Sequence, residues 1–186
     1  GFWGALRLAL YVLFGSPSMV LRYWWRALND RDTPQRVRRV RALAGELDAR
    51  LSKGARVLEG SFERGLYSHD LGRVPPFIGR GMYRSMPLVV AQPRTEDDLL
   101  KTLDCAREEQ LAVYPRGISS SAFGGSVPTR NGVVIDLSLL SKIKEIDAES
   151  KAATVEPGVR WADLATAAAK YDLVPVTTPT SRFSTI

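Results

Sequence analysis

A glycine- and serine-rich stretch follows an apolar segment in the middle of the sequence and reads Pro115-Arg116-Gly117-Ile118-Ser119-Ser120-Ser121-Ala122-Phe123-Gly124-Gly125. The irregular connection that contains it extends to residue 131, which is longer than the roughly four to six residues usual between elements. Glycines let backbone N–H groups approach an anion closely, and serine hydroxyls and an arginine add further donors. The stretch therefore predicts an anion-binding loop, and a Gly/Ser hairpin without a ligand is the alternative.

Two well-known phosphate motifs are absent from the sequence. It contains no G-x-x-x-x-G-K-[ST], which excludes a Walker A nucleotide hydrolase, and no G-x-G-x-x-G that opens a helix, which argues against a Rossmann dinucleotide site. A single cysteine, Cys105, excludes an internal disulfide and a multi-cysteine metal site. A single histidine, His69, argues against a histidine-rich metal site, so we expect no metal. We interpret His69 as a lone surface histidine in a loop, and a base with Asp70 as its orienting partner is the alternative.

Regular patterns surround the loop from residue 88 onward. We expect strands at 88–91, 112–114, 132–137 and 174–176, a hairpin of 143–147 with 152–156, and helices from Thr95 and over 161–171. Glu96, Asp97 and Asp98 suit the positive start of the first helix. Its predicted buried face contains Leu99, Leu100, Leu103 and Ala106, with Cys105 half-buried beside it. This order of elements indicates an α+β domain.

Residues 88–186 resemble the N-terminal half of the FAD-binding domain of the vanillyl-alcohol oxidase / p-cresol methylhydroxylase (PCMH-type) flavoproteins. The resemblance covers 99 of 186 residues and rests on segments 87–93, 95–99, 115–117, 132–138, 155–158 and 179–186. Within this family the sequence is similar to D-lactate/glycolate dehydrogenase-type FAD-linked oxidases, through segments 67–72 and 82–87. The implied fold is the N-terminal half of a PCMH-type FAD-binding domain preceded by a helical segment rich in arginine and aromatic residues.

The resemblance implies a set of FAD-binding residues. The loop would hold the FAD pyrophosphate, the 157–158 turn would line the cofactor, and residues 179–186 would lead into a second contact with it; the residues concerned are Arg116, Gly117, Ile118, Ser119, Ser120, Ser121, Ala122, Gly124, Gly125, Pro157, Gly158, Pro179, Thr185 and Ile186. Ile118 stands where many members have glycine. No histidine occupies the loop position used for covalent flavin attachment, so we expect noncovalent FAD. The family's catalytic residues lie mainly beyond this stretch and cannot be named.

The resemblance also implies an activity. We expect an FAD-dependent oxidoreductase that oxidises a 2-hydroxy acid by hydride transfer to flavin N5, with electrons passed to a quinone or iron–sulfur partner and not to NAD. The alternative is a non-catalytic membrane- or partner-docking module on a cofactor-free fragment. Because the sequence begins at Gly1 and ends without a closing element, we expect it to be part of a longer protein.

The positive charge of the sequence belongs to its first half. Residues 1–94 carry 16 Lys+Arg against 7 Asp+Glu, whereas residues 95–186 carry 10 against 13. Seven of the sixteen aromatic residues stand in the first 25, in apolar runs too short for a membrane span. Aromatic rings interspersed with arginines suit a bilayer interface or a docking partner. No nucleic-acid-binding motif accompanies the charge, so we expect no nucleic-acid partner.

We therefore divide the chain into three parts. Residues 1–28 form an apolar aromatic/arginine segment for a membrane surface or a partner, residues 29–87 an amphipathic helix and an irregular connector, and residues 88–186 the truncated FAD-binding domain. The helix is expected over 33–51 with Thr33 as its N-cap, and its arginines (36, 38, 39 and 41) form a solvated face or a phosphate contact. We expect a cytoplasmic protein, peripheral on the inner face of the cell membrane if residues 1–28 meet lipid.

Overall fold

The computed structural model describes residues 33–72 and 86–186, and residues 1–28, which we assigned to membrane or partner docking, lie outside the described residues. The described elements are, in chain order, α3 (Pro34–Arg50), β1 (Arg56–Leu58), α4 (Ser61–Leu66), β2 (Val89–Gln92), α6 (Glu96–Glu108), β3 (Ala112–Arg116), β4 (Gly132–Asp136), β5 (Ile143–Asp147), β6 (Ala152–Val155) and α7 (Trp161–Ala168). Short 3-10 turns follow β4 at Leu137–Leu139 and α7 at Ala169–Tyr171.

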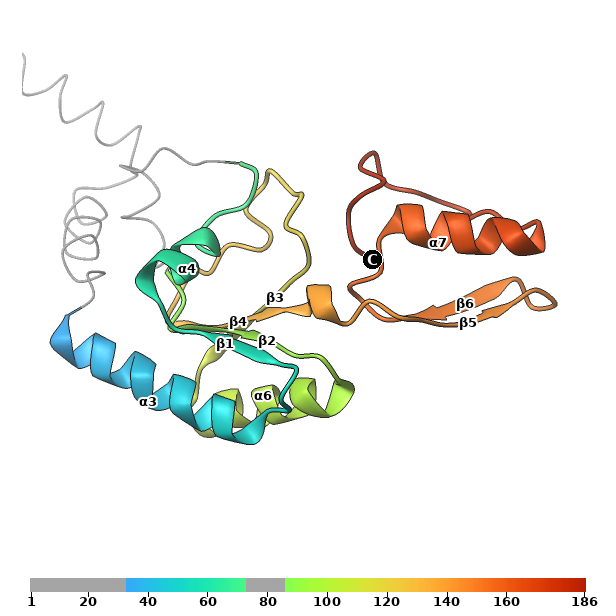
Figure 1. Cartoon of the computed structure of the whole chain (residues 1–186). Coiled ribbons are helices and arrows are strands. Elements are labelled where there is room, and N and C mark those ends of the chain that lie inside the picture. Colours follow the sequence, from blue (N-terminus) through green and yellow to red (C-terminus); the bar gives the residue numbers. More distant parts are fainter. Residues whose placement is uncertain (1–32, 73–85) are drawn as a thin grey trace, which may run out of the picture.

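A four-stranded sheet in the order β1-β2-β4-β3 forms the centre of the fold (Figure 1). β2 and β3 both run parallel to β4, and β1 pairs antiparallel with β2. All five residues of β4 are buried, as expected for a central parallel strand. The register places Arg116, the last residue of β3, opposite Asp136, the last residue of β4. The Gly/Ser loop therefore leaves the sheet at the carboxyl ends of its parallel strands.

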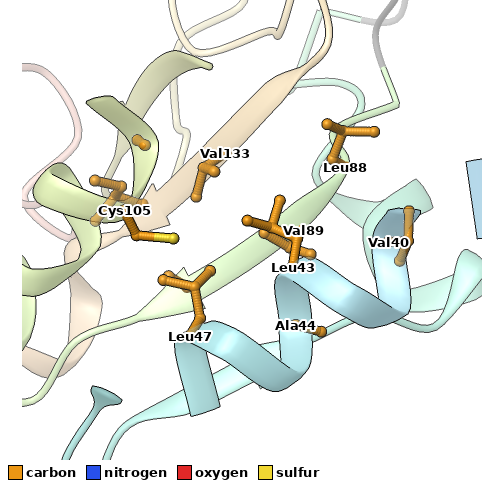
Figure 2. Packing of buried hydrophobic residues seen from close by; sticks show 11 residues of the cluster. Val40, Leu43, Ala44, Leu47, Leu88, Val89, Cys105 and Val133 are labelled. Atoms are coloured by element: carbon orange, nitrogen blue, oxygen red, sulfur yellow. The ribbon is translucent and has the colours of Figure 1, made fainter. Parts of the chain in front are cut away.

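Helices α3 and α6 cover one face of this sheet (Figure 1). The Thr33 side chain accepts a hydrogen bond from the backbone N–H of Arg36 and Pro34 occupies the first turn, so α3 begins where the sequence predicts. Figure 2 shows Leu43 and Leu47 of α3 directed toward Val89 and Cys105 in the buried cluster. The amphipathic helix from the 29–87 part therefore shares one hydrophobic core with the sheet.

The arginines of α3 divide between two environments. Those at positions 38, 39 and 41 are exposed, as both a solvated face and a phosphate contact require. Arg36 instead donates from its guanidinium to Oδ1 of Asn131 and to the carbonyl oxygen of Met86, both at 2.8 Å. It ties the start of α3 to the segments that precede β2 and β4.

The buried face of α6 differs from the predicted one. Leu100 and Leu103 are 55% and 39% exposed, whereas Asp98, Thr102, Cys105 and Ala106 are buried. Cys105 is fully buried and not half-buried. The cause is at the start of the helix, where the Asp98 carboxylate accepts hydrogen bonds from Ser52 and from the N–H groups of Arg94 and Thr95. This polar anchor turns the face that begins at residue 98, rather than the leucine face, toward the sheet.

The segment that we expected to be an irregular connector contains β1 and α4. β1 has only three residues, too few for an alternating pattern, and pairs with β2 at the sheet edge. Within α4, Arg64 is buried and donates to the carbonyl oxygens of Glu59 and Pro87 at 2.9 and 3.0 Å. These bonds fix α4 to the start of β2.

A second unit follows β4, in which the β5–β6 hairpin lies beside α7 (Figure 1). A cavity of about 260 Å³ lies between them, lined mainly by apolar side chains such as Trp161 and Leu164. The predicted strand at 174–176 is wrong. Residues 174–176 form no strand pairing with any described residue, and Val174 is 81% exposed. Pro175 has no N–H to donate to a strand ladder, which opposes pairing there.

Candidate functional site

The Gly/Ser loop presents a row of unpaired backbone donors. Within the described chain, the N–H groups of residues 118–122 donate to no protein acceptor. Ser119 and Gly124 adopt left-handed φ values of 56° and 77°, which change the direction of the backbone at two points. Because the serines among these residues add hydroxyl groups, this part of the loop is chemically suited to bind a phosphate or another anion.

Contacts within the loop give it a defined shape. The hydroxyl oxygens of Ser119 and Ser126 lie 2.5 Å apart, and the N–H of Phe123 donates to the Ser121 hydroxyl oxygen at 3.2 Å. Residues 121–125 are exposed, and the Phe123 side chain, 98% exposed, stands at the loop tip. These bonds define the conformation of the loop between Ser119 and Ser126.

Three separate segments meet at the beginning of the loop. A Cβ atom added to Gly117 would overlap the hydroxyl oxygen of Thr185, so only glycine permits this approach. The N–H of Ile186 donates to the carbonyl oxygen of Val159 at 3.0 Å, which links the end of the described chain to the 157–158 turn. The structure thus brings Gly117, Gly158 and Thr185 of the predicted set into one continuous region. Pro179 is exposed in the 177–180 segment, and among the described residues no hydrogen bond joins it to that region.

Arg116 connects the loop to the segment after α4. Its Nη1 donates to the carbonyl oxygens of His69 at 2.9 Å and Tyr67 at 3.3 Å, and its guanidinium carbon lies 4.9 Å from the centre of the Tyr67 ring. Burial lowers the pKa of Arg116, although Tyr67, Asp136 and Asp70 oppose this change. The guanidinium of Arg116 is therefore held by Tyr67 and His69 at the start of the loop. A contact between Arg116 and FAD stays a prediction.

Asp136 is a buried carboxylate at the end of β4, next to the loop. Its Oδ2 accepts from Tyr67 Oη at 2.7 Å and Gln92 Nε2 at 2.8 Å, and its Oδ1 accepts from the N–H of Ser138 at 3.0 Å. Burial alone would raise the pKa of Asp136, but these hydrogen bonds outweigh it and the pKa is lowered. Burial and the bond to Asp136 raise the pKa of Tyr67, so the phenol keeps its proton. The network fixes Tyr67 beneath Arg116.

Asp70 contacts the loop, whereas the sequence indicated it only as an alternative orienting partner of His69. It is 4% exposed, and its carboxylate accepts from the N–H groups of Gly72 at 2.9 Å and Gly124 at 2.7 Å. The His69 ring instead lies near the Ser68 hydroxyl, at 3.5 Å from Nδ1. The carboxylate therefore orients loop amides and not the neighbouring imidazole. The Tyr-Ser-His-Asp-Leu-Gly segment has a glycine two positions after Asp70, but this local pattern does not indicate the distant partner Gly124.

The described residues contain neither a metal-binding cluster nor a membrane-spanning helix. No group of three or more His, Cys, Asp or Glu residues in 33–72 and 86–186 is arranged to hold a metal ion. Within the same ranges no helix has both the length and the apolar character needed to cross a bilayer.

Comparison with known families shows to which protein family the segment containing the loop is similar. A family model described as "FAD binding domain" matches residues 87–186, which is more than half of the chain. This chain belongs to that FAD-binding family. The match begins at β2 and includes the Gly/Ser loop, the β5–β6 hairpin and α7. The resemblance inferred from the sequence motifs is confirmed, and the cofactor of this FAD-binding domain is FAD.

Curated relatives are similar in sequence to part of this chain. The glycolate oxidase subunit GlcD of Bacillus subtilis is 36% identical over 105 residues, which are 56% of this chain and 22% of the relative. The mitochondrial D-lactate dehydrogenase [cytochrome] of Arabidopsis thaliana is 34% identical over 80 residues, 43% of this chain and 14% of the relative. The chain therefore spans about a fifth or less of the length of these relatives.

Solved structures confirm the fold of this FAD-binding domain. An alkyldihydroxyacetonephosphate synthase matches with a TM-score of 0.64 and 20% identity over 83% of this chain and 30% of its own. p-Cresol methylhydroxylase matches with a TM-score of 0.61 and 20% identity over 80% of this chain and 27% of its own. The predicted α+β class and PCMH-type fold are thus confirmed.

The loop fits the cofactor of the family. FAD carries a pyrophosphate, and consecutive N–H groups with serine hydroxyls are the donors that phosphate oxygens accept. Residues 118–122 supply such donors, and Gly117 permits the backbone approach beside Thr185. The assignment of individual residues to FAD stays a prediction, to be tested as described below.

Proposed function

We propose that the protein containing this chain is an FAD-dependent oxidoreductase that oxidises a small 2-hydroxy acid and passes the electrons to a quinone or an iron–sulfur partner. The observation that carries the proposal is the row of unpaired loop donors at residues 118–122 within a chain of the FAD-binding family. The names of the relatives, glycolate oxidase subunit and D-lactate dehydrogenase [cytochrome], support the substrate class and an acceptor other than NAD.

In this proposal the chain's own residues bind and orient the cofactor. The N–H groups of residues 118–122 and the hydroxyls of Ser119–Ser121 hold the pyrophosphate, and the 157–158 and 185–186 segments border it. Bound FAD supplies the two-electron redox chemistry that protein side chains lack. Because residues 115–125 contain no histidine, we propose that the flavin is held without a covalent bond through this loop.

The first experiment is a visible spectrum of the full-length protein, purified and then supplemented with FAD. A bound flavin spectrum is expected, and addition of glycolate or D-lactate without oxygen should bleach it as the hydroxy acid becomes a 2-oxo acid. A protein that binds no flavin would favour the non-catalytic docking module. Bound flavin that none of a panel of 2-hydroxy acids bleaches would contradict the substrate class alone.

The electron acceptor is tested separately from the substrate. With the reducing 2-hydroxy acid present, turnover should be supported by a soluble quinone analogue and not by NAD⁺. Turnover with NAD⁺ at a comparable rate would contradict the proposed acceptor while leaving the FAD assignment intact.

The placement of the pyrophosphate is tested at Gly117. Gly117→Val puts a branched side chain where the Thr185 hydroxyl lies, so the loop and the 185–186 segment must separate. We expect the Kd for FAD to rise at least about tenfold, because backbone donors lose their alignment with the phosphates. Gly45→Ala is the matched control, since nothing lies within 4 Å of its new methyl group. An unchanged Kd in a folded Gly117→Val protein would show that the pyrophosphate binds elsewhere.

A further inference from the structure

Residues 67–72, which we name the strap, lie outside the 87–186 segment that matches the FAD-binding family, yet they bond to the Gly/Ser loop. Figure 1 shows the chain after α4 running alongside the loop that follows β3. The contacts occur at two places, the beginning of the loop and its tip. Each place uses a charged side chain that is largely withdrawn from water.

At the loop tip the contact is made by Asp70, Leu71 and Gly72. The Asp70 carboxylate accepts the N–H of Gly124 at 2.7 Å, and the N–H of Leu71 donates to the carbonyl oxygen of Ser121 at 3.1 Å. A Cβ atom on Gly72 would overlap the carbonyl oxygen of Ala122, so the two backbones touch. The loop tip is thus bonded on one side to the strap.

At the beginning of the loop the contact runs in the opposite direction. Arg116, the residue that opens the loop, donates to the strap carbonyls of Tyr67 and His69. The Tyr67 hydroxyl donates to the Asp136 carboxylate at the end of β4. The strap is therefore anchored to the central sheet at the same end from which the loop leaves it.

The backbone N–H groups of the loop fall into two sets, one with a protein acceptor and one without. The N–H of Gly124 is taken by Asp70, whereas those of residues 118–122 have no protein acceptor in the described chain. A hydrogen bond to a buried carboxylate is stronger than one between neutral groups, so it holds the tip at its left-handed Gly124 against the entropy of a long loop. Ordering a loop before a ligand arrives removes that cost from binding.

We propose that Asp70 is a positioning residue for FAD: its carboxylate fixes the tip of the loop through Gly124, so that the N–H groups of residues 118–122 are aligned before the pyrophosphate binds. The proposal rests on the proposed function of the loop. It adds the strap, from outside the family match, to the residues that determine FAD affinity. Asp70 itself does not touch the cofactor in this role.

The test measures FAD affinity and apoprotein stability in the full-length protein. Asp70→Asn removes the charge and one of the two acceptor oxygens, and we expect the Kd for FAD, from quenching of flavin fluorescence, to rise about tenfold. The midpoint of thermal unfolding of the apoprotein should fall by only a few degrees. Asp147→Asn is the matched control, because Asp147 accepts the N–H groups of Glu149 and Ser150 in the exposed β5–β6 turn. It should leave the Kd unchanged.

A second variant covers the case in which Asp70→Asn does not fold. Gly72→Ala pushes the strap away from Ala122 without removing any charge, and it should raise the Kd in the same direction. Amide hydrogen exchange at Gly124, whose N–H donates to the Asp70 carboxylate, should become faster in the apoprotein of both variants. A Kd within twofold of the parent in whichever of these variants folds would overturn the proposal. If the Gly117→Val protein still shows weaker FAD binding, the proposed function survives that outcome.

Discussion

Asp98 is a carboxylate with no solvent exposure, held by the N–H and hydroxyl of Ser52 and by the N–H groups of Arg94 and Thr95. Burial alone would raise the pKa of Asp98, but the four hydrogen bonds outweigh it and lower the pKa to about 2. Asp98 also forms a capping box with Thr95 at the start of α6, because its carboxylate accepts the Thr95 N–H and its own N–H donates to the Thr95 hydroxyl oxygen. One residue therefore joins the turn after α3 to the start of α6.

This pKa predicts an acid-dependent loss of stability. Since the folded-state pKa lies below the ordinary value of 3.8, the contribution of Asp98 is complete above about pH 5 and is lost as the pH falls toward 2. A shift of this size corresponds to roughly 2 kcal/mol in the free energy of unfolding. Asp98→Asn should lower that free energy at pH 7 by a similar amount and flatten its pH dependence between 5 and 2. Denaturant unfolding at a series of pH values measures both.

The control for this prediction is Asp147. Hydrogen bonds from Ser150 and Glu149 lower the pKa of this carboxylate as well, but its side chain is exposed. Solvent screens an exposed group, so Asp147→Asn should change the pH dependence far less. An Asp98→Asn protein whose stability still falls steeply between pH 5 and 2 would show that another carboxylate is responsible.

At the scale of elements, α3 connects the N-terminal part of the chain to the FAD-binding domain. Leu47 is fully buried in the cluster shared with β2, β4 and α6, although α3 precedes the family match. Leu47→Ala should lower the free energy of unfolding by about 2 to 5 kcal/mol, because it leaves a cavity in a packed core. Gly45→Ala, on the exposed face of the same helix, should raise it by roughly 0.5 to 1 kcal/mol.

Urea unfolding of both variants, followed by far-ultraviolet circular dichroism and by release of FAD, tests this assignment. The two signals should shift together in Leu47→Ala if the helix and the cofactor domain unfold as one unit. A Leu47→Ala protein that releases FAD at the parent's urea concentration would show that α3 is independent of the domain.

Elements with a local signal were predictable from the sequence, and those that depend on distant partners were not. The start of α3 follows from Thr33 and Pro34, and the loop from its glycines and serines. The three-residue β1 forms only because β2 offers an edge, and the buried face of α6 depends on the contact between Asp98 and Ser52. The bond between Asp70 and Gly124 joins residues 54 positions apart, so no local pattern indicated it.

Across the whole chain, the excess positive charge and the proposed FAD contacts lie in different parts of the sequence. Residues 95–186, which carry most of the proposed FAD contacts, hold 10 Lys+Arg and 13 Asp+Glu, whereas residues 1–94 hold 16 and 7. We propose that this charge asymmetry relates to the location of the protein rather than to the reaction. We propose that the arginines at positions 7, 22 and 26, together with the seven aromatics of the first 25 residues, bind the surface of an anionic membrane.

Flotation with lipid vesicles tests this location. The full-length protein should float with vesicles that contain anionic phosphatidylglycerol, and a protein lacking residues 1–28 should not. Raising the salt to about 0.5 M should weaken the association, because each arginine near an anionic surface contributes only about 1 kcal/mol and is screened. Vesicles of neutral phosphatidylcholine separate this electrostatic part from insertion of the aromatic rings. Equal flotation of the two proteins would remove the membrane proposal, and a deleted protein that retains full FAD binding would show that the anchor and the cofactor site act independently.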